Sequence, residues 1–215
     1  MSRFFCIPKL IINKNISYFV KNTFFKNNIM KYLIVGLGNI GPEYAFTRHN
    51  AGFMVLDRLA AKENLSFKVD RLASVAELKY KSRSITLIKP TTYMNLSGKA
   101  LQHWMSVLKI PIDNVMILVD DLALPLGKLR IKPKGSSAGH NGLKNIELIL
   151  GNDIYPRLKI GIGSDFTKGR QIDYVLGKFS DNDMIDLMPK LDKAIDMILS
   201  FCTVGIAPTM NFLNE

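Results

Sequence analysis

The sequence has few of the residues on which metal sites and disulfide frameworks are built. Its 215 residues include only two cysteines, Cys6 and Cys202, and three histidines. The two cysteines form no CxxC pair, so we expect neither a zinc or other metal site nor a disulfide framework, and we expect a reducing compartment. No apolar run approaches the roughly 20 residues that a membrane helix needs, so we expect no membrane partner.

Acidic residues are also scarce. The chain has 18 Asp and Glu against 29 Lys and Arg, which gives a net charge of +11. A surplus of this size favours a polyanionic partner, with RNA or DNA first. A generally basic, soluble surface is the alternative, and charge alone does not separate the two. Apolar residues make up 47% of the chain, which is enough for the core of one globular domain.

Residues 1–29 differ in composition from the rest of the chain. They hold five of the 29 basic residues and none of the 18 acidic ones, so the remainder still carries +6. Three interpretations compete for these residues: a targeting peptide, a basic arm that contacts nucleic acid, or an artefact of the assigned start site. A single arginine and the lack of a small-residue cleavage site argue against targeting, and Met30 stands directly before a strong first strand. We therefore treat residues 1–29 as an N-terminal extension, disordered or a start-site artefact, and residues 30–215 as one domain.

From Met30 onward, strand-like and helix-like patterns alternate. Apolar residues at helical spacing predict helices over 50–64, 95–110, 140–151 and 181–202. Apolar or alternating runs predict strands over 32–36, 75–81, 84–90, 115–121, 127–135 and 157–163. This alternation predicts a single α/β domain, in which a twisted, mostly parallel or mixed central sheet carries helices on both faces.

The first predicted strand runs directly into GLGNIG, residues 36–41, a pattern typical of a dinucleotide-binding turn. Such a turn needs a helix to begin near its second glycine, because the helix N-terminus receives the pyrophosphate. Here Pro42 and Glu43 follow, and the helix begins only near Asn50. The carboxylate of Glu43 would also repel a phosphate. The sequence therefore favours a tight strand-to-loop turn over a nicotinamide cofactor site.

Polar side chains gather instead at strand ends and at loop-to-helix junctions. They are Asn39, His49 with Asn50, Asn95, Asp120 with Asp121, and His140 with Asn141. In open α/β sheets, ligands bind beyond the carboxyl ends of the strands, so we expect these groups to form one site. A histidine held by an aspartate is a tuned general base, and asparagine amides hold a carbonyl or a water without titrating. The set predicts hydrolysis by an activated water rather than covalent catalysis.

Each of these features has a simpler explanation when it is taken alone. A lone histidine is usually structural, and a loop asparagine commonly forms a turn or caps a helix. The glycine-rich segment 134–142 is either a flexible loop or an anion-binding nest. The four cations at 128, 130, 132 and 134 indicate either a solvated edge strand or contacts to an RNA backbone.

Four segments, taken in order, resemble bacterial-type peptidyl-tRNA hydrolases. They are VGLGNIGPEYAFTRHNAGF, KPTTYMNLSG, VDDLALPLGKLRIKPKGSSAGHNGLK and RLKIGIG, all within residues 30–215. The resemblance implies a cytoplasmic, monomeric esterase without a cofactor. Its substrate would be peptidyl-tRNA, and it would cleave the ester between the peptide and the 3′-terminal ribose of the tRNA. A non-catalytic RNA or ribosome binder of the same fold is the alternative, and the His49–Asp120 pair argues against it.

The resemblance also implies roles for individual residues. His49 would be the general base on water, Asp120 would keep it basic and oriented, and Asn39 would help to distinguish N-blocked from free aminoacyl-tRNA. The substrate- and tRNA-binding residues that it implies are Tyr44, Tyr93, Met94, Asn95, Arg130, Lys132, His140, Asn141 and Lys159. Lys159 stands where relatives often have arginine, which predicts a weaker grip on phosphate because lysine cannot bind it in a bidentate way.

Overall fold

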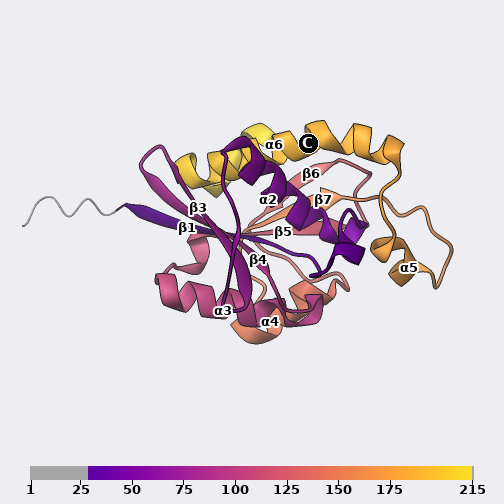
Figure 1. The fold of residues 1–215 in the computed structure, drawn as a ribbon, viewed down its shortest axis with the longest axis horizontal. Helices are drawn as coiled ribbons and strands as arrows, with labels where there is room; N and C mark the ends of the chain where they lie inside the picture. Colours follow the sequence, from indigo (N-terminus) through magenta and orange to yellow (C-terminus); the bar gives the residue numbers. More distant parts are fainter. Residues whose placement is uncertain (1–28, 215) are drawn as a thin grey trace, which may run out of the picture.

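A seven-stranded mixed sheet forms the centre of the computed structural model, which describes residues 29–214 (Figure 1). The strands are β1 (Met30–Gly36), β2 (Lys68–Asp70), β3 (Ala73–Tyr80), β4 (Arg83–Pro90), β5 (Val115–Asp121), β6 (Leu129–Lys132) and β7 (Arg157–Gly161). Their order in the sheet is β2-β3-β4-β1-β5-β7-β6. β4, β1, β5 and β7 are parallel, whereas β2, β3 and β6 pair antiparallel with their neighbours.

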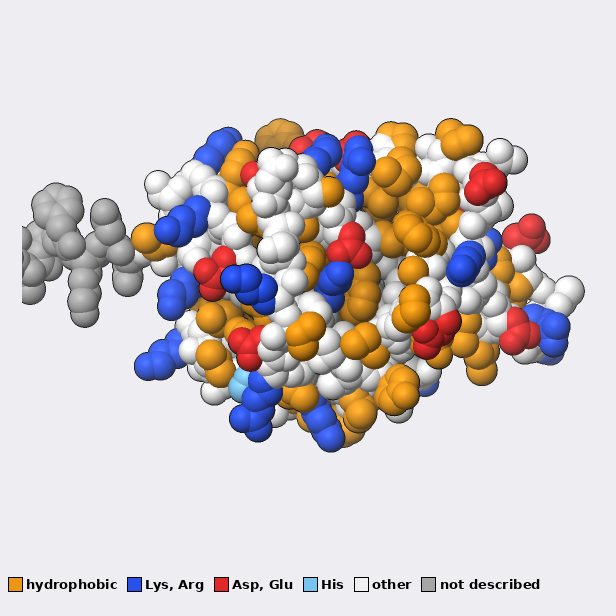
Figure 2. Space-filling view, in the orientation of Figure 1, with side chains coloured by type: hydrophobic (Ala, Val, Ile, Leu, Met, Phe, Trp, Pro, Cys, Tyr) orange, Lys and Arg blue, Asp and Glu red, His pale blue; other side chains and the backbone are white. Residues whose placement is uncertain are grey.

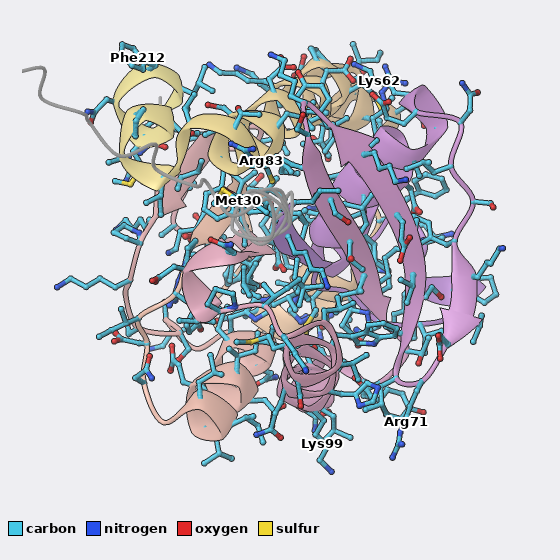
Figure 3. All side chains as sticks on the ribbon, turned by 90° about the vertical axis from the view of Figure 1, so that its left-hand side faces the viewer. Met30, Lys62, Arg71, Arg83, Lys99 and Phe212 are labelled. Atoms are coloured by element: carbon cyan, nitrogen blue, oxygen red, sulfur yellow. The ribbon has the colours of Figure 1, made fainter. Side chains whose placement is uncertain are left out.

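Helices cover both faces of this sheet. They are α2 (Ala51–Lys62), α3 (Ser97–Leu108), α4 (Asn141–Leu150), α5 (Gln171–Leu176), α6 (Asp181–Val204) and α7 (Ile206–Leu213). Within residues 29–214, four short 3₁₀ turns lie in the connections: η1 (Pro42–Tyr44), η2 (Arg48–Asn50), η3 (Met94–Leu96) and η4 (Ile112–Asn114). α2 and α6 lie on one face and α3 and α4 on the other, and Figure 3 shows these layers end on. The predicted α/β class with a mixed sheet is confirmed.

The position of the central strands between two layers of helices explains why their sequences are continuously apolar. Successive side chains of a strand point to opposite faces, so a strand between two helix layers buries all of them. In β1, Ile34 packs into the core beneath α2 and α6, whereas Leu33 packs into the core on the α3 and α4 side. In β5, Leu118 and Ile117 divide between the same two cores.

The sequence analysis assigned no element to β2, α5 or α7. The three residues of β2 are all exposed, and α5 has six residues of which none is buried. Neither segment therefore carries an apolar period that would reveal it. The proposed N-terminal extension lies outside the described residues, apart from Ile29. Within residues 29–214, no helix combines the length and the apolar character needed to cross a membrane.

Glycines after β1 allow the chain to pass close to α2. A Cβ atom on Gly36 would lie 2.6 Å from the main-chain oxygen of Gly52, and one on Gly38 would lie 2.7 Å from the ring of Phe53. A Cβ on Gly41 would meet the carboxylate of Glu43. The space above this turn is therefore filled by a helix, a ring and an anion, which leaves no cradle for a pyrophosphate. The glycine motif serves packing.

The strand order predicts a ligand-binding crevice at the carboxyl ends of β1 and β5. β1 lies beside β5, and the chain leaves β1 toward β4 on one side of the sheet but leaves β5 toward β6 and β7 on the other side. In doubly wound sheets this switch point, outside the carboxyl ends of the strands, is where ligands bind. Asn39 lies in the loop after β1, Met94 begins η3 after β4, and Asp121 is the last residue of β5.

We expect the Gly36→Ala variant to lose about 1 to 3 kcal/mol of unfolding free energy, because the added methyl group overlaps backbone rather than a movable side chain. Urea denaturation followed by circular dichroism measures this loss. An unchanged midpoint with an unchanged slope would show that β1 and α2 do not need the close approach.

Candidate active site

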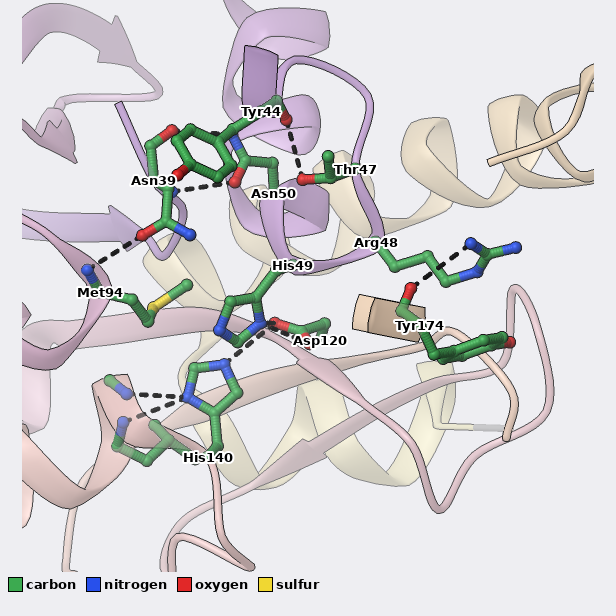
Figure 4. Close-up of polar contacts among 12 residues, drawn as sticks. Asn39, Tyr44, Thr47, Arg48, His49, Asn50, Met94, Asp120, His140 and Tyr174 are labelled. Carbon is green, nitrogen blue, oxygen red and sulfur yellow. Dashed lines mark hydrogen bonds and ion pairs between the residues drawn. The ribbon is translucent and has the colours of Figure 1, made fainter. Parts of the chain in front are cut away.

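The carboxylate of Asp120, at the end of β5, lies between two histidines (Figure 4). Nδ1 of His49 is 3.0 Å from Oδ2 of Asp120, and Nε2 of His140 is 3.0 Å from Oδ1. His49 belongs to η2, in the connection between β1 and α2, and His140 is the residue directly before α4. The side chain of Asp120 is only 3% exposed, so the two imidazoles replace the water that this charge has lost.

Helix α4 fixes the tautomer of His140. The ring Nδ1 accepts hydrogen bonds from the main-chain N–H groups of Gly142 and Leu143, at 3.1 and 3.3 Å. A nitrogen that accepts two N–H groups carries no proton, so the proton of the neutral ring is on Nε2. Nε2–H then donates to Asp120. His140 is therefore a hydrogen-bond donor to the carboxylate and has no free lone pair with which to act as a base.

His49 is left with the opposite arrangement. Its Nδ1–H donates to both oxygens of Asp120, at 3.2 and 3.0 Å, so the lone pair of the neutral ring is on Nε2. Within residues 29–214, Nε2 has no hydrogen-bond partner among the protein groups. Its lone pair is thus available to a water or a substrate, as a general base requires.

The charge of Asp120 is stable in this environment. Burial alone raises the pKa of Asp120, but attraction to His140 and His49 and their hydrogen bonds outweigh it and hold the pKa well below its ordinary range. Asp120 therefore stays ionised at neutral pH. An ionised carboxylate beside His49 favours the protonated imidazole that forms when the ring accepts a proton.

The same three side chains form a possible metal-ligand set. One ligand atom from each of His49, Asp120 and His140 lies within 4.8 Å of the others. A metal bound to Nε2 of His140 would require the proton on Nδ1, yet the N–H groups of Gly142 and Leu143 point at Nδ1. The site is therefore built for hydrogen bonding and fits a metal ion poorly.

Asn39 is held in one orientation beside this array. Its main-chain N–H donates to Oδ1 of Asn50 and its main-chain oxygen accepts from Nδ2 of Asn50, both at 2.9 Å. Its side-chain Oδ1 accepts from the main-chain N–H of Met94, at 3.1 Å. Figure 4 shows its amide nitrogen on the side of the site where the free ring nitrogen of His49 lies. The sequence analysis placed Asn50 in the cluster without a role, and this reciprocal pair gives it one.

The other expected binding residues divide by position. A hollow of about 180 Å³, which we name the His49 hollow, is lined by His49, Asp120, His140, Asn141 and Lys159 among others. Met94 is buried in the core and reaches the site through its main-chain N–H. Tyr93, at 67% exposed, and Asn95 lie on the surface of the loop after β4, outside the lining of this hollow. Tyr44 is half-buried in η1.

Three of the expected cations lie on one face at the edge of the sheet. Arg130 of β6 is opposite Lys159 of β7, and Lys132 lies two residues further along β6 on the same side. Lys132 is exposed and Arg130 is half-buried. Nζ of Lys159 lies 2.6 Å from Oδ2 of Asp121, so part of its charge is already balanced. Lys132 is therefore more available than Lys159 to bind an anion from solution.

Arg48, the neighbour of His49, is a residue that the sequence analysis missed. Its guanidinium donates to the main-chain oxygens of Gly177 and Lys178, at 3.3 and 2.9 Å, and pairs with Asp183 at 3.3 Å. It also lies over the ring of Tyr174, 4.3 Å from the centroid. These contacts join the turn that carries His49 to the segment between α5 and α6. Their partners are about 130 residues away in sequence, so no local pattern signals them.

Comparisons with known proteins identify relatives of this chain. The family model of peptidyl-tRNA hydrolases matches residues 33–215. A peptidyl-tRNA hydrolase of Bacteroides fragilis is 57% identical over 186 residues, which cover 86% of this chain and 100% of that protein. One of Cytophaga hutchinsonii is 54% identical over 185 residues, or 86% of this chain and 98% of that protein.

A solved structure supports the same assignment. The crystal structure of a peptidyl-tRNA hydrolase from Acinetobacter baumannii superposes with a TM-score of 0.80 and 34% identity, and covers 90% of this chain and 97% of that one. The match extends over the sheet and its helices, and the relatives in sequence match over nearly their whole length. This chain therefore belongs to the peptidyl-tRNA hydrolase family.

Proposed function

We propose that this protein hydrolyses the ester bond between a peptide and the 3′-terminal ribose of tRNA, and so recycles tRNA from peptidyl-tRNA released prematurely by the ribosome. The observation that carries the proposal is the hydrogen-bonded series His140–Asp120–His49, which leaves one lone pair on Nε2 of His49. A non-catalytic RNA binder of the same fold would have no need of a buried carboxylate whose two partners fix a base.

The reaction needs one proton to move twice. Nε2 of His49 takes a proton from water while the water oxygen attacks the ester carbonyl carbon, which gives a tetrahedral oxyanion. Asp120 stabilises the imidazolium that results, and the oxyanion collapses with cleavage of the bond to the ribose 3′ oxygen. The imidazolium returns the proton to that oxygen, so the products are a peptide carboxylic acid and a tRNA with a free 3′ hydroxyl. General-base catalysis of this kind contributes roughly 10²- to 10⁴-fold.

The fixed amide of Asn39 gives the site a way to require a blocked amino group. Because its Oδ1 accepts from Met94, Asn39 presents N–H donors to the substrate. The peptide bond of an N-blocked substrate offers a carbonyl oxygen that can accept from Asn39. The ammonium of a free aminoacyl-tRNA is a donor and cannot pair with it. This mismatch favours peptidyl-tRNA over the aminoacyl-tRNA used in translation.

The tRNA would lie along the basic side of the site. Lys132, Arg130 and Lys159 lie on one face of β6 and β7, and Lys159 with Asn141 lines the His49 hollow. We place the 3′ end of the tRNA in this hollow and its phosphates over the cations, with Tyr44, Tyr93 and Asn95 as further substrate contacts. We propose that the protein acts as a cytoplasmic monomer without a cofactor.

We expect the His49→Ala variant to lose at least about 10²-fold in the rate of cleavage of N-acetyl-phenylalanyl-tRNA, because the base is removed.

We expect the Asp120→Asn variant to lose about 10²- to 10⁴-fold in the same rate, because the substitution places the proton of His49 on the wrong ring nitrogen. The amide has one acceptor for two ring N–H groups, and the tautomer of His140 is fixed by α4. His49 must therefore place its proton on Nε2, where the lone pair is needed.

Single-turnover rates measure both losses, and retained binding of deacylated tRNA shows that the variants fold. Asp113→Asn is the matched control, because Asp113 is exposed in η4 before the start of β5 and should keep the wild-type rate. If His49→Ala cleaves as fast as wild type, the mechanism is wrong. A wild-type protein that binds tRNA but cleaves nothing would support the RNA-binding alternative.

We expect the Asn39→Ala variant to cleave free aminoacyl-tRNA better relative to N-acetyl-aminoacyl-tRNA, because the donor that reads the blocking group is gone. The ratio of kcat/KM for the two substrates measures this change, and roughly a tenfold shift corresponds to one lost hydrogen bond of about 1.4 kcal/mol. Asn211→Ala, an exposed change on α7, is the control. An unaltered ratio would remove Asn39 from discrimination.

We expect the Lys132→Ala variant to bind tRNA more weakly and to reduce the slope of log affinity against log salt concentration by about one unit. Lys79→Ala is the matched control, because Lys79 is exposed and pairs with Ser84 at the opposite edge of the sheet. Filter binding over a salt series measures the slope. The same slope in wild type and Lys132→Ala would take Lys132 out of the phosphate contacts.

A further inference from the structure

A second hollow, of about 260 Å³, begins at Asn39 and Asn50, the asparagine pair beside His49. Its apolar walls are Ile40 and Phe46 from the loop after β1, Phe53 and Met54 from α2, and Pro90 at the end of β4. We name it the Phe46 hollow. The sequence analysis gave none of these five residues a role, and the mechanism above does not use them.

The rim of this hollow exposes apolar side chains to solvent. Phe46 is 57% exposed and Ile40 is 48% exposed. In Figure 2, hydrophobic side chains gather right of centre on this face, in the region between α2 and α6 of Figure 1. Apolar surface beside a candidate active site is typical of a ligand-binding groove.

The main chain keeps Phe46 at the rim. Its φ angle is 62°, in the left-handed region that a bulky residue rarely adopts. The main-chain N–H of Phe179 donates to the oxygen of Phe46 at 3.1 Å, and Thr47 forms a bridge with Lys178. The segment between α5 and α6 thus fixes the backbone of Phe46 while its ring stays largely open. Strain of this kind is common at ligand-binding sites.

The charges of the Phe46 hollow do not suit a phosphate. Among the described residues, Lys89 is the one cation that lines it, and its Nζ contacts Oδ1 of Asp57 at 2.5 Å and lies 4.3 Å from the ring centroid of Phe67. The His49 hollow, in contrast, adjoins the cations of β6 and β7. The nucleic-acid part of the substrate therefore matches the His49 hollow, and an apolar group matches the Phe46 hollow.

We propose that the Phe46 hollow binds the side chain of the amino acid esterified to the tRNA and prefers a large apolar one. This inference rests on the proposed function, since the amide of Asn39 would hold the adjoining peptide bond at the start of the hollow. The hollow is open to solvent, so it adds a preference without excluding other side chains. Such tolerance is necessary in an enzyme that must release many different peptides.

The test compares two substrates on one tRNA, N-acetyl-phenylalanyl and N-acetyl-glycyl, both charged by an aminoacylating ribozyme so that the RNA is identical. Wild type should favour the phenylalanyl ester in kcat/KM by roughly 3- to 10-fold, the lower end of what apolar pockets give. The double variant Ile40→Ala, Phe46→Ala should bring this ratio close to one. Ser74→Leu, which adds bulk to the lining, should also lower the ratio.

Phe212→Ala is the matched control, because Phe212 is an 82% exposed phenylalanine on α7, away from both hollows (Figure 3). It should keep the ratio and both rates, and thermal melting shows that all variants are folded. A wild-type ratio near one, or a ratio unchanged in the double variant, overturns the inference. An equal loss on both esters also overturns it, because the hollow would then hold the tRNA end. Cleavage of neither ester by wild type instead refutes the proposed function.

Discussion

The buried carboxylate of Asp120 is the charge around which the site is arranged. An ionised group removed from water must be paired or it shifts its pKa, and here two imidazole N–H groups supply the pairing. One of them, on His140, is oriented by the first N–H groups of α4. The helix therefore determines which nitrogen of His140 carries a proton, Asp120 passes that constraint to His49, and His49 is left with its lone pair facing outward. The base of the site therefore depends on the N-terminus of α4, whose capping residue His140 lies beside His49 with the ring centroids 4.8 Å apart.

The packing of β1 against α2 brings the other half of the site into place. Gly36 and Gly52 allow the two backbones to meet, and the chain then returns through η1 and η2 so that Asn39 and Asn50 pair eleven residues apart. This closed loop sets Asn39 and His49 side by side. The glycine-rich motif that resembles a dinucleotide turn thus has a function, but a helix and a phenyl ring occupy the volume that a cofactor would need.

Much of this fold was predictable because strands that are buried on both faces have continuously apolar sequences. Residues 32–36 of β1 and 115–119 of β5 are apolar because both of their faces are covered, and Asp120 stands out as the first charge after such a run. The meeting of Asp120 with His49 followed from the rule that carboxyl ends share one edge, together with the family resemblance. The tautomer of His140 and the contacts of Arg48 did not follow, because they depend on how α4 and the α5–α6 segment dock. The hydrogen-bond partners of Arg48 lie 126 to 135 residues away in the chain.

The basic edge shows how a neighbouring carboxylate decides which cation remains free to bind an anion. Arg130 and Lys159 are cross-strand neighbours of like charge, an arrangement that destabilises a sheet unless a counter-charge is near. Asp121, directly after Asp120, supplies that counter-charge to Lys159 at 2.6 Å. The charge of a lysine ammonium is compact and is largely neutralised by such a close partner. A guanidinium has five N–H donors, so it can pair with a carboxylate and still donate to a phosphate. Under the proposed function, we therefore expect the electrostatic attraction of tRNA to rest mainly on the exposed Lys132, where salt screens it more strongly.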